Sequence, residues 1–307
     1  MSTGWTKDNI PDLSEKVVII TGASSGLGLE TATAMAEKNA TVILAVRNME
    51  KGQAALDKIK AVHAGAKTRL MKLDLVDFAS VRTFATQFLN DYGTLSILIN
   101  NAGIMNTPYR ITADGFESQF GSNHLGHFAL TGLLLPRLLN TPSSRIVTLS
   151  SLAAHGASID FDNLDGAKGY SSWKFYGQSK LANLIFAKEL NNRLSIHKHS
   201  TVSVACHPGF SNTNLMSFGS GKRANPLMRL ITQLGTQPAH MGALPSLYSA
   251  TSPNIKGGEY IGPDGRGGRK GYPKNDSIID KLYQPNVSQK LWEVSEQLTG
   301  VAFRFDQ

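Results

Sequence analysis

Cysteine is almost missing from this sequence, with Cys206 the only one in 307 residues. A single cysteine cannot form an intrachain disulfide or build a cysteine-based metal cluster, so we expect no bound metal. Long apolar runs are missing too. The longest candidate, residues 128–135, ends at Pro136 and is far shorter than the roughly 18 residues that a membrane span needs. The sequence therefore predicts a protein without a membrane anchor.

Signals for export and for division into domains are also lacking. The first fifteen residues carry four charged side chains and no apolar signal core, so we expect a cytoplasmic protein. No block of charge and no Pro/Ser-rich linker interrupts the chain. Because the residues AVILMFWYC make up 41% of it, and α/β folds of this size often form one unit, we predict a single domain over residues 1–307.

Acidic residues are the scarcer charge, with 23 Asp and Glu against 31 Lys and Arg and a formal net charge of +8. Residues 221–274 hold eight basic residues and two acidic ones. A nucleic-acid reader would place such bases on one helix or between stacking aromatics, whereas these lie among Gly and Pro. We expect no nucleic-acid partner. The stretch is either a solvated surface or a feature that attracts an anionic phosphate ligand.

Short β-branched runs alternate with helical patterns along the first two thirds of the chain, which is typical of βαβ units. The predicted strands are residues 17–20, 42–44, 69–73, 95–99, 146–149 and 202–205, and the predicted helices are 27–37, 50–62, 80–91, 115–139 and 175–194. This alternation predicts an α/β fold with a Rossmann-like, doubly wound parallel sheet. Right-handed crossovers then place any ligand along the edge where the strands end.

The last hundred residues follow a different pattern. Residues 210–236 look loop-like but are apolar in patches, a helix is expected over 239–249, and a Gly-rich stretch covers 257–271. A last helix is expected over 277–298, and residues 301–305 could form a docked tail. We interpret 210–236 as an apolar substrate flap and 257–307 as a C-terminal extension. Packing of 210–236 on the sheet, or a subunit contact there, is the alternative.

A glycine-rich turn joins the first strand to the first helix. Residues 21–28 read Thr-Gly-Ala-Ser-Ser-Gly-Leu-Gly, with Gly22, Gly26 and Gly28 in a GxxxGxG spacing. Small residues at such a junction let a pyrophosphate approach the backbone, and the helix N-terminus supplies free N–H donors. The turn therefore predicts a dinucleotide site; a merely flexible Gly/Ser turn is the alternative.

The residues after the second and third strands bear on which dinucleotide would bind. An NAD-type fold places an acidic residue after the second strand, but Arg47 stands there, and a guanidinium suits the 2′-phosphate of NADP. We therefore expect NADP(H), with NAD(H) possible; an ordinary surface arginine is the alternative. Asp74, at the end of the third strand, either lies beside the adenine or caps the next helix.

Tyr176 and Lys180 are four residues apart in a helical pattern, so both project from one face. The fifth strand leads into Ser150 and Ser151, which places a hydroxyl at the same edge. An ammonium about 4.5 Å from the phenol would stabilise the phenolate by roughly 4 kcal/mol at an effective dielectric constant of 20, which brings the Tyr176 pKa near 7. General acid/base catalysis works best there. For the two serines, helix capping is the alternative.

Together these motifs resemble the short-chain dehydrogenase/reductase family over nearly the whole chain. The matching residues are the glycine turn at 21–28, Asn-Asn-Ala-Gly at 100–103, Asn123, Ser151, Tyr176 with Lys180, and His-Pro-Gly at 207–209. The runs at 121–128 and 176–183 are most similar to the retinol dehydrogenase and protochlorophyllide reductase-like branch. In the family the second serine of the pair usually takes the catalytic position, which favours Ser151 over Ser150.

The resemblance implies catalytic roles for four residues. Tyr176 passes a proton to or from the substrate oxygen, and Ser151 orients that oxygen. Lys180 binds the nicotinamide ribose and lowers the tyrosine pKa. Asn123 helps to hold a water that links Lys180 to solvent, although a simple hydrogen-bonding role in its helix is compatible with the same position.

The resemblance also implies where the cofactor lies. Phosphates run along the glycine turn, the adenosine ribose lies near the strand-four motif, and the nicotinamide lies near the turn after strand six; simple strand-end hydrogen bonding is compatible with Asn101. The expected cofactor-binding residues are Gly22, Ser24, Ser25, Gly26, Leu27, Gly28, Arg47, Asp74, Leu75, Asn101, Ala102, Gly103, Tyr176, Lys180, Pro208, Gly209 and Thr213. Family members suggest a homo-dimer or homo-tetramer.

We therefore expect an NADP(H)-dependent alcohol dehydrogenase or carbonyl reductase. Its substrate would be an apolar ketone, aldehyde or secondary alcohol, with His155, Trp173 and Leu215 near it. Membrane-bound retinol dehydrogenases carry an anchor and light-driven reductases a reactive cysteine in the substrate region, so neither a membrane-resident retinoid nor a pigment is the expected substrate. The alternative function is a non-catalytic, NADP-sensing regulator with the same fold.

Overall fold

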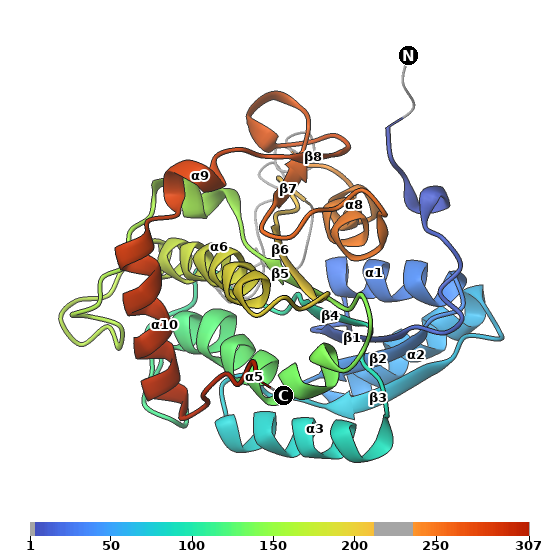
Figure 1. The fold of residues 1–307 in the computed structure, drawn as a ribbon, viewed down its shortest axis with the longest axis horizontal. Helices are drawn as coiled ribbons and strands as arrows, with labels where there is room; N and C mark the ends of the chain where they lie inside the picture. Colours follow the sequence, from blue (N-terminus) through green and yellow to red (C-terminus); the bar gives the residue numbers. More distant parts are fainter. Residues whose placement is uncertain (1–3, 212–235, 307) are drawn as a thin grey trace.

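The computed structural model describes residues 4–211 and 236–306. Within them, strands form one sheet in the order β3-β2-β1-β4-β5-β6-β7-β8 (Figure 1). The strands are β1 (Val17–Thr21), β2 (Thr41–Val46), β3 (Thr68–Lys72), β4 (Ile97–Asn100), β5 (Arg145–Leu149), β6 (Val202–Cys206), β7 (Tyr260–Pro263) and β8 (Pro273–Asn275). All neighbours pair parallel except β8, which pairs antiparallel with β7. The predicted doubly wound parallel sheet is confirmed.

Helices cover both faces of this sheet (Figure 1). The longer ones are α1 (Gly26–Glu37), α2 (Met49–Val62), α3 (Phe78–Asp91), α5 (Gly126–Leu139), α6 (Ser172–Ile196), α8 (Ala239–Thr251) and α10 (Pro285–Thr299). Successive strand residues point to opposite faces: Val18 and Ile20 pack with α1, α2 and α8, whereas Ile19 packs with α3, α5, α6 and α10. Burial on both faces explains why the strands read as nearly continuous apolar runs.

The six predicted strands are confirmed, with each end within two residues of its expected position. Two predicted helices are wrong in detail. The helix expected over 115–139 is interrupted, because α4 (Ser118–Phe120) passes into a π-helical turn, Gly121–Leu125, before α5 begins. The last helix is two helices, α9 (Ile279–Leu282) and α10, since the chain is extended at Tyr283 and Gln284 before Pro285 opens α10.

The C-terminal part of the chain is built into the fold. Strands β7 and β8, which the Gly-rich pattern did not predict, extend the sheet beyond β6. The tail packs as expected: Val301, Phe303 and Phe305 are buried, and the Phe303 ring lies 4.8 Å from Phe128 and 4.6 Å from Trp292, measured between ring centroids. The docked tail is therefore confirmed.

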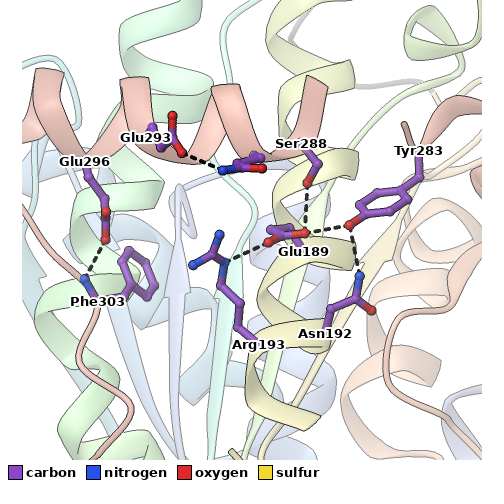
Figure 2. A network of polar contacts seen from close by, with 9 residues as sticks. Glu189, Asn192, Arg193, Tyr283, Ser288, Glu293, Glu296 and Phe303 are labelled. Carbon is purple, nitrogen blue, oxygen red and sulfur yellow. Dashed lines mark hydrogen bonds and ion pairs between the residues drawn. The ribbon is translucent and has the colours of Figure 1, made fainter. Parts of the chain in front are cut away.

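Figure 2 shows how the C-terminal helices are held to α6. The Glu189 carboxylate on α6 accepts hydrogen bonds from Arg193 Nε at 2.8 Å, Tyr283 Oη at 2.6 Å and Ser288 Oγ at 3.0 Å. The guanidinium of Arg193 also lies 4.2 Å from the centre of the Trp292 ring. One carboxylate therefore ties α10 and the segment before it to α6, and it is largely shielded from water.

Among the helices of residues 4–211 and 236–306, none is both long enough and apolar enough to cross a membrane.

Candidate active site

The sequence-predicted site residues gather at one edge of the sheet. Strands β1, β4, β5 and β6 are parallel neighbours, so the residues that follow them lie at the same edge. Gly22 follows β1, Asn101 follows β4, Ser150 follows β5 and His207 follows β6. Helix α6 packs on β5 and β6 and brings Tyr176 to this edge.

The glycine turn is shaped for close contact between backbone segments. Gly22 and Gly26 have φ values of 68° and 55°, in the left-handed region. A Cβ on Gly28 would lie 2.5 Å from Gly22 O and 2.6 Å from Asn101 Nδ2, so a side chain would push α1 away from the turn.

The start of α1 is suited to an anion. Ser25, its N-cap residue, makes no side-chain capping hydrogen bond, and the first turn has no acidic residue. The first N–H groups of a helix carry partial positive charge and need acceptors. The turn therefore fits the pyrophosphate of a dinucleotide.

The strand-four motif is tied to the glycine turn through Thr21. Its Oγ1 accepts hydrogen bonds from the backbone N–H groups of Asn101 and Ala102, each at 2.9 Å, and Asn101 Nδ2 donates to Thr21 O at 2.7 Å. Strand-end hydrogen bonding, the plain alternative for Asn101, is thus present. Gly103 comes next and faces Lys180 and Asn123, because a Cβ there would lie 3.2 Å from Lys180 Nζ and 3.3 Å from Asn123 Oδ1.

The residues expected to contact the adenosine end of a dinucleotide lie after β2 and β3. Arg47 is exposed directly after β2, and the side chain of Asn48 caps α2. Asp74 is half-buried and accepts a hydrogen bond from the Val76 N–H at 3.3 Å. The alternative that Asp74 caps the next helix is wrong, because Asp77 is the N-cap residue of α3. Leu75 is buried where α5 begins, since a Cβ on Gly126 would lie 2.5 Å from Leu75 O.

The two serines after β5 have different partners. Ser150 Oγ donates to Lys180 O at 2.7 Å and so ties β5 to α6. Ser151 caps the short helix Leu152–Gly156, where its Oγ accepts from Ala153 N at 3.2 Å. The capping alternative therefore holds for Ser151, but it uses only a lone pair of the hydroxyl. The same hydroxyl lies near enough to the buried phenol of Tyr176 to lower the pKa of Tyr176.

Burial dominates the electrostatics of Tyr176 and Lys180. It raises the pKa of Tyr176 above its usual value and outweighs the opposing effect of the Ser151 hydroxyl. It lowers the pKa of Lys180 to about 8, and Lys180 Nζ donates to Leu149 O at 3.1 Å. The expectation that the ammonium brings the Tyr176 pKa near 7 is therefore wrong for this structure, because that expectation left out the free energy of removing both groups from water.

Asn123 lies in the π-helical turn and is fully buried. Its Oδ1 accepts from the Ile104 N–H at 2.8 Å, and its Nδ2 donates to Ile104 O at 3.0 Å and to Ser179 Oγ at 2.9 Å. The amide therefore joins the segment after β4 to α6, and its oxygen lies close to Gly103. A π-helical turn inside a helix commonly marks a functional position.

The substrate side of the edge is partly described. Trp173 is 61% exposed, and its ring centre lies 5.9 Å from that of Tyr176. His155 is half-buried and packs edge-on against the rings of His207 and Tyr260. Thr213, Leu215 and nearly all of the expected flap over residues 210–236 lie outside the described residues.

The turn after β6 is pinned to the loop before β8. Gly209 has a φ of 63°, and a Cβ there would lie 2.3 Å from Arg269 O. The neighbouring Phe210 N–H donates to the same carbonyl oxygen at 2.8 Å. Pro208 and Gly209 thus hold a fixed position beside the edge where Ser151 and Tyr176 meet.

Two buried residues near the site, Tyr260 and His127, were not among the predicted site residues. Tyr260 is fully buried on β7, and its hydroxyl donates to Ser151 O at 3.4 Å. His127, also fully buried, contacts Thr21 and Asn123. A histidine four residues after Asn123 in a mostly apolar helix is the one signal that could have pointed to His127.

Comparisons with known proteins agree with this geometry. The family model described as short chain dehydrogenase matches residues 16–222. The chain belongs to the short-chain dehydrogenase/reductase family. Its relatives within that family include retinol dehydrogenases, which places it on the retinol dehydrogenase-like branch. Retinol dehydrogenase 11 of Mus musculus is 41% identical over 98% of this chain and 91% of its own length, and retinol dehydrogenase 14 of Homo sapiens is 36% identical over 93% and 87%.

Solved structures of family members share the fold. A crystal structure of an uncharacterized protein from Mycobacterium Paratuberculosis is 40% identical, with a TM-score of 0.80 over 98% of this chain and all of that one. A short chain dehydrogenase from Shigella flexneri, solved in complex with NADP, is 21% identical, with a TM-score of 0.64 over 82% of this chain and 98% of its own.

Proposed function

We propose that this family member is an NADP(H)-dependent oxidoreductase that interconverts an apolar carbonyl compound and its alcohol. The observation that carries the proposal is the buried phenol of Tyr176 at the sheet edge, near enough to the Ser151 hydroxyl for Ser151 to lower its pKa, with Lys180 one helical turn further along α6. The retinol dehydrogenases among its relatives, by their names, act on an apolar alcohol, which supports this substrate class.

The cofactor proposal rests on the residues that would hold each end of it. The uncapped start of α1 suits the pyrophosphate, and the exposed guanidinium of Arg47 suits a 2′-phosphate, which favours NADP(H) over NAD(H). When bound, the nicotinamide ring supplies or accepts the hydride. Lys180 and Asn101 would hold the riboses, and Pro208 and Gly209 would border the nicotinamide.

The proton is handled by the chain itself. Because burial raises the pKa of Tyr176, the phenol is protonated at neutral pH and can act as the acid in carbonyl reduction. The Ser151 hydroxyl donates to the same carbonyl oxygen and orients it. When Tyr176 gives up its proton, the charged amine of Lys180 on the same helix face stabilises the phenolate. In alcohol oxidation the same groups take the proton back.

Trp173 is the described residue best placed to contact an apolar substrate. Its ring is largely exposed and lies next to that of Tyr176. Burying this ring against an apolar substrate would therefore favour binding. The substrates to test are therefore apolar ketones, aldehydes and secondary alcohols, together with the primary allylic alcohol that the names of the relatives suggest.

Reduction of an apolar aldehyde series with NADPH and NADH side by side tests the proposal, followed through nicotinamide absorbance. Tyr176→Phe should lower kcat by at least about 100-fold while the Kd for NADPH stays almost unchanged. Tyr248→Phe is the matched control, because Tyr248 is half-buried on α8 at the opposite face. Equal turnover by Tyr176→Phe and the wild-type protein would refute the mechanism.

A further inference from the structure

His127 is a fully buried histidine with a partner on each side of its ring. Its Nδ1 lies 2.9 Å from the backbone oxygen of Asn123, and its Nε2 lies 2.8 Å from Thr21 Oγ1. The first partner belongs to the π-helical turn and the second to the end of β1, where the glycine turn starts. One imidazole therefore joins two segments that are more than a hundred residues apart in the sequence.

The direction of both hydrogen bonds follows from the partners. A carbonyl oxygen only accepts, so Nδ1 carries a proton and donates it to Asn123 O. Burial is the main cause that lowers the pKa of His127 to about 4; the hydrogen bond to Asn123 O opposes it and the nearby charge of Lys180 adds to it, so the ring is neutral and Nε2 is an acceptor. The donor to Nε2 is the Thr21 hydroxyl.

Thr21 then connects His127 to the strand-four motif. Its oxygen accepts the N–H groups of Asn101 and Ala102, which leaves its own proton to donate. The other possible acceptor, Ile99 O, is 3.4 Å away, against 2.8 Å for His127 Nε2, so the shorter contact is the hydrogen bond. Asn101 and Ala102 are residues that we propose to border the cofactor.

The position of the ring is itself fixed. Thr131 Oγ1 donates to His127 O at 2.7 Å and accepts from Asn100 Nδ2 at 3.0 Å. The backbone that carries the imidazole is thereby linked to the last residue of β4. A rigid ring with a donor on one side and an acceptor on the other can hold both partners at a set separation.

We propose that His127 is a positioning residue. Through Thr21, its Nε2 holds the strand-four motif at Asn101 and Ala102, and its Nδ1 holds the π-helical turn that carries Asn123. The inference rests on the proposed function, since it assigns the two nitrogens to cofactor binding and to catalysis respectively. It predicts that the effect of His127 on the Kd for NADPH and its effect on kcat can be separated by substitution.

Three variants of the full-length protein separate the effect on Kd from the effect on kcat. His127→Phe keeps a ring but loses both hydrogen bonds, and should raise the Kd for NADPH and lower kcat, each about tenfold. His127→Gln keeps a polar group near the position of Nε2, and should lower kcat about tenfold with the Kd within about twofold of wild type. His127→Asn keeps a donor near the position of Nδ1, and should show the reverse pattern. The Kd is measured by fluorescence titration without substrate.

Thr251→Ala is the matched control. Thr251 Oγ1 donates to Leu247 O at 2.7 Å, so this variant also loses a buried side-chain hydrogen bond, but within α8 and away from the π-helical turn. It should lower the Tm without changing Kd or kcat. If His127→Phe does not fold, the Gln and Asn variants still give the split.

The outcomes distinguish the two claims. Opposite changes of Kd and kcat in the Gln and Asn variants support the inference. Parallel changes that follow the loss of Tm, or no change at all, overturn it while leaving the proposed function intact. A wild-type protein that does not bind NADPH overturns the proposed function, and this inference with it.

Discussion

Replacing Gly28 by alanine should weaken cofactor binding more than it weakens the fold. The added Cβ would lie 2.5 Å from Gly22 O and 2.6 Å from Asn101 Nδ2. The first atom is backbone, and the second is held by its 2.7 Å hydrogen bond to Thr21 O, so neither can move away at little cost. The start of α1 must therefore shift away from the turn where we propose that the pyrophosphate binds.

The expected size of the effect follows from the overlap. Overpacking of this kind costs about 1–3 kcal/mol, and alanine recovers up to about 1 kcal/mol because it forms helix better than glycine. The net loss of folding stability should therefore be small. Cofactor binding has no such compensation. A loss of about 1.4 kcal/mol in binding free energy already raises the Kd tenfold. We expect the Kd for NADPH, measured by fluorescence titration, to rise at least about tenfold.

Gly93→Ala is the control, because a Cβ at Gly93 meets nothing within 4 Å. It should leave both the Kd and the Tm unchanged. A Gly28→Ala protein that binds NADPH as tightly as the wild type would refute the assignment of the pyrophosphate to the glycine turn.

Arg47→Glu should raise the KM for NADPH and leave that for NADH nearly unchanged, because it replaces a phosphate partner by a repelling charge; equal changes for both cofactors would remove Arg47 from the phosphate site. Glu189→Gln should lower the free energy of unfolding by about 1–3 kcal/mol in urea, since the carboxylate accepts three hydrogen bonds, whereas the exposed Glu293→Gln should change it by under about 0.5 kcal/mol. Because burial lowers the pKa of His127 from 6.5 to about 4, the unfolded chain binds a proton in that window that the folded chain does not. The free energy of unfolding should therefore fall as the pH drops from 6.5 to 4, and His127→Gln should reduce that slope.

The sequence predicted most of the fold because its strands alternate with helices and are apolar on both faces. The π-helical turn could not be found in this way, since Phe120 and Gly126 on either side of it keep ordinary helical dihedral angles. The helical pattern of apolar residues therefore continues across the turn and does not reveal its extra residue. Strand β7 was missed because Gly262 weakens its apolar pattern, yet glycine is needed there because a Cβ would lie 1.9 Å from His207 Nε2.

The candidate site could be predicted residue by residue but not in its electrostatics. Motif spacing was enough to bring Ser151, Tyr176 and Lys180 to one edge. The pKa of Tyr176 was not predictable from the spacing, because the charge effect depends on one distance whereas the desolvation depends on everything packed around the phenol. The local sequence could draw attention to His127, but no local pattern could pair it with Thr21, which lies in a distant segment.

The C-terminal helices bear on the proposed catalysis although they contribute none of the predicted site residues. Helix α10 is tied to α6, which carries Tyr176, by Glu189, and to the π-helical turn by the hydrogen bond between Ser295 and His124. Helix α10 thus contacts both α6, which carries Tyr176 and Lys180, and the π-helical turn, which carries Asn123; we propose catalytic roles for these three residues. A misplacement of about 1 Å can cost a reaction about 100-fold in rate. The extension beyond β6 is therefore best understood as part of the frame that sets the distance between Asn123 and α6.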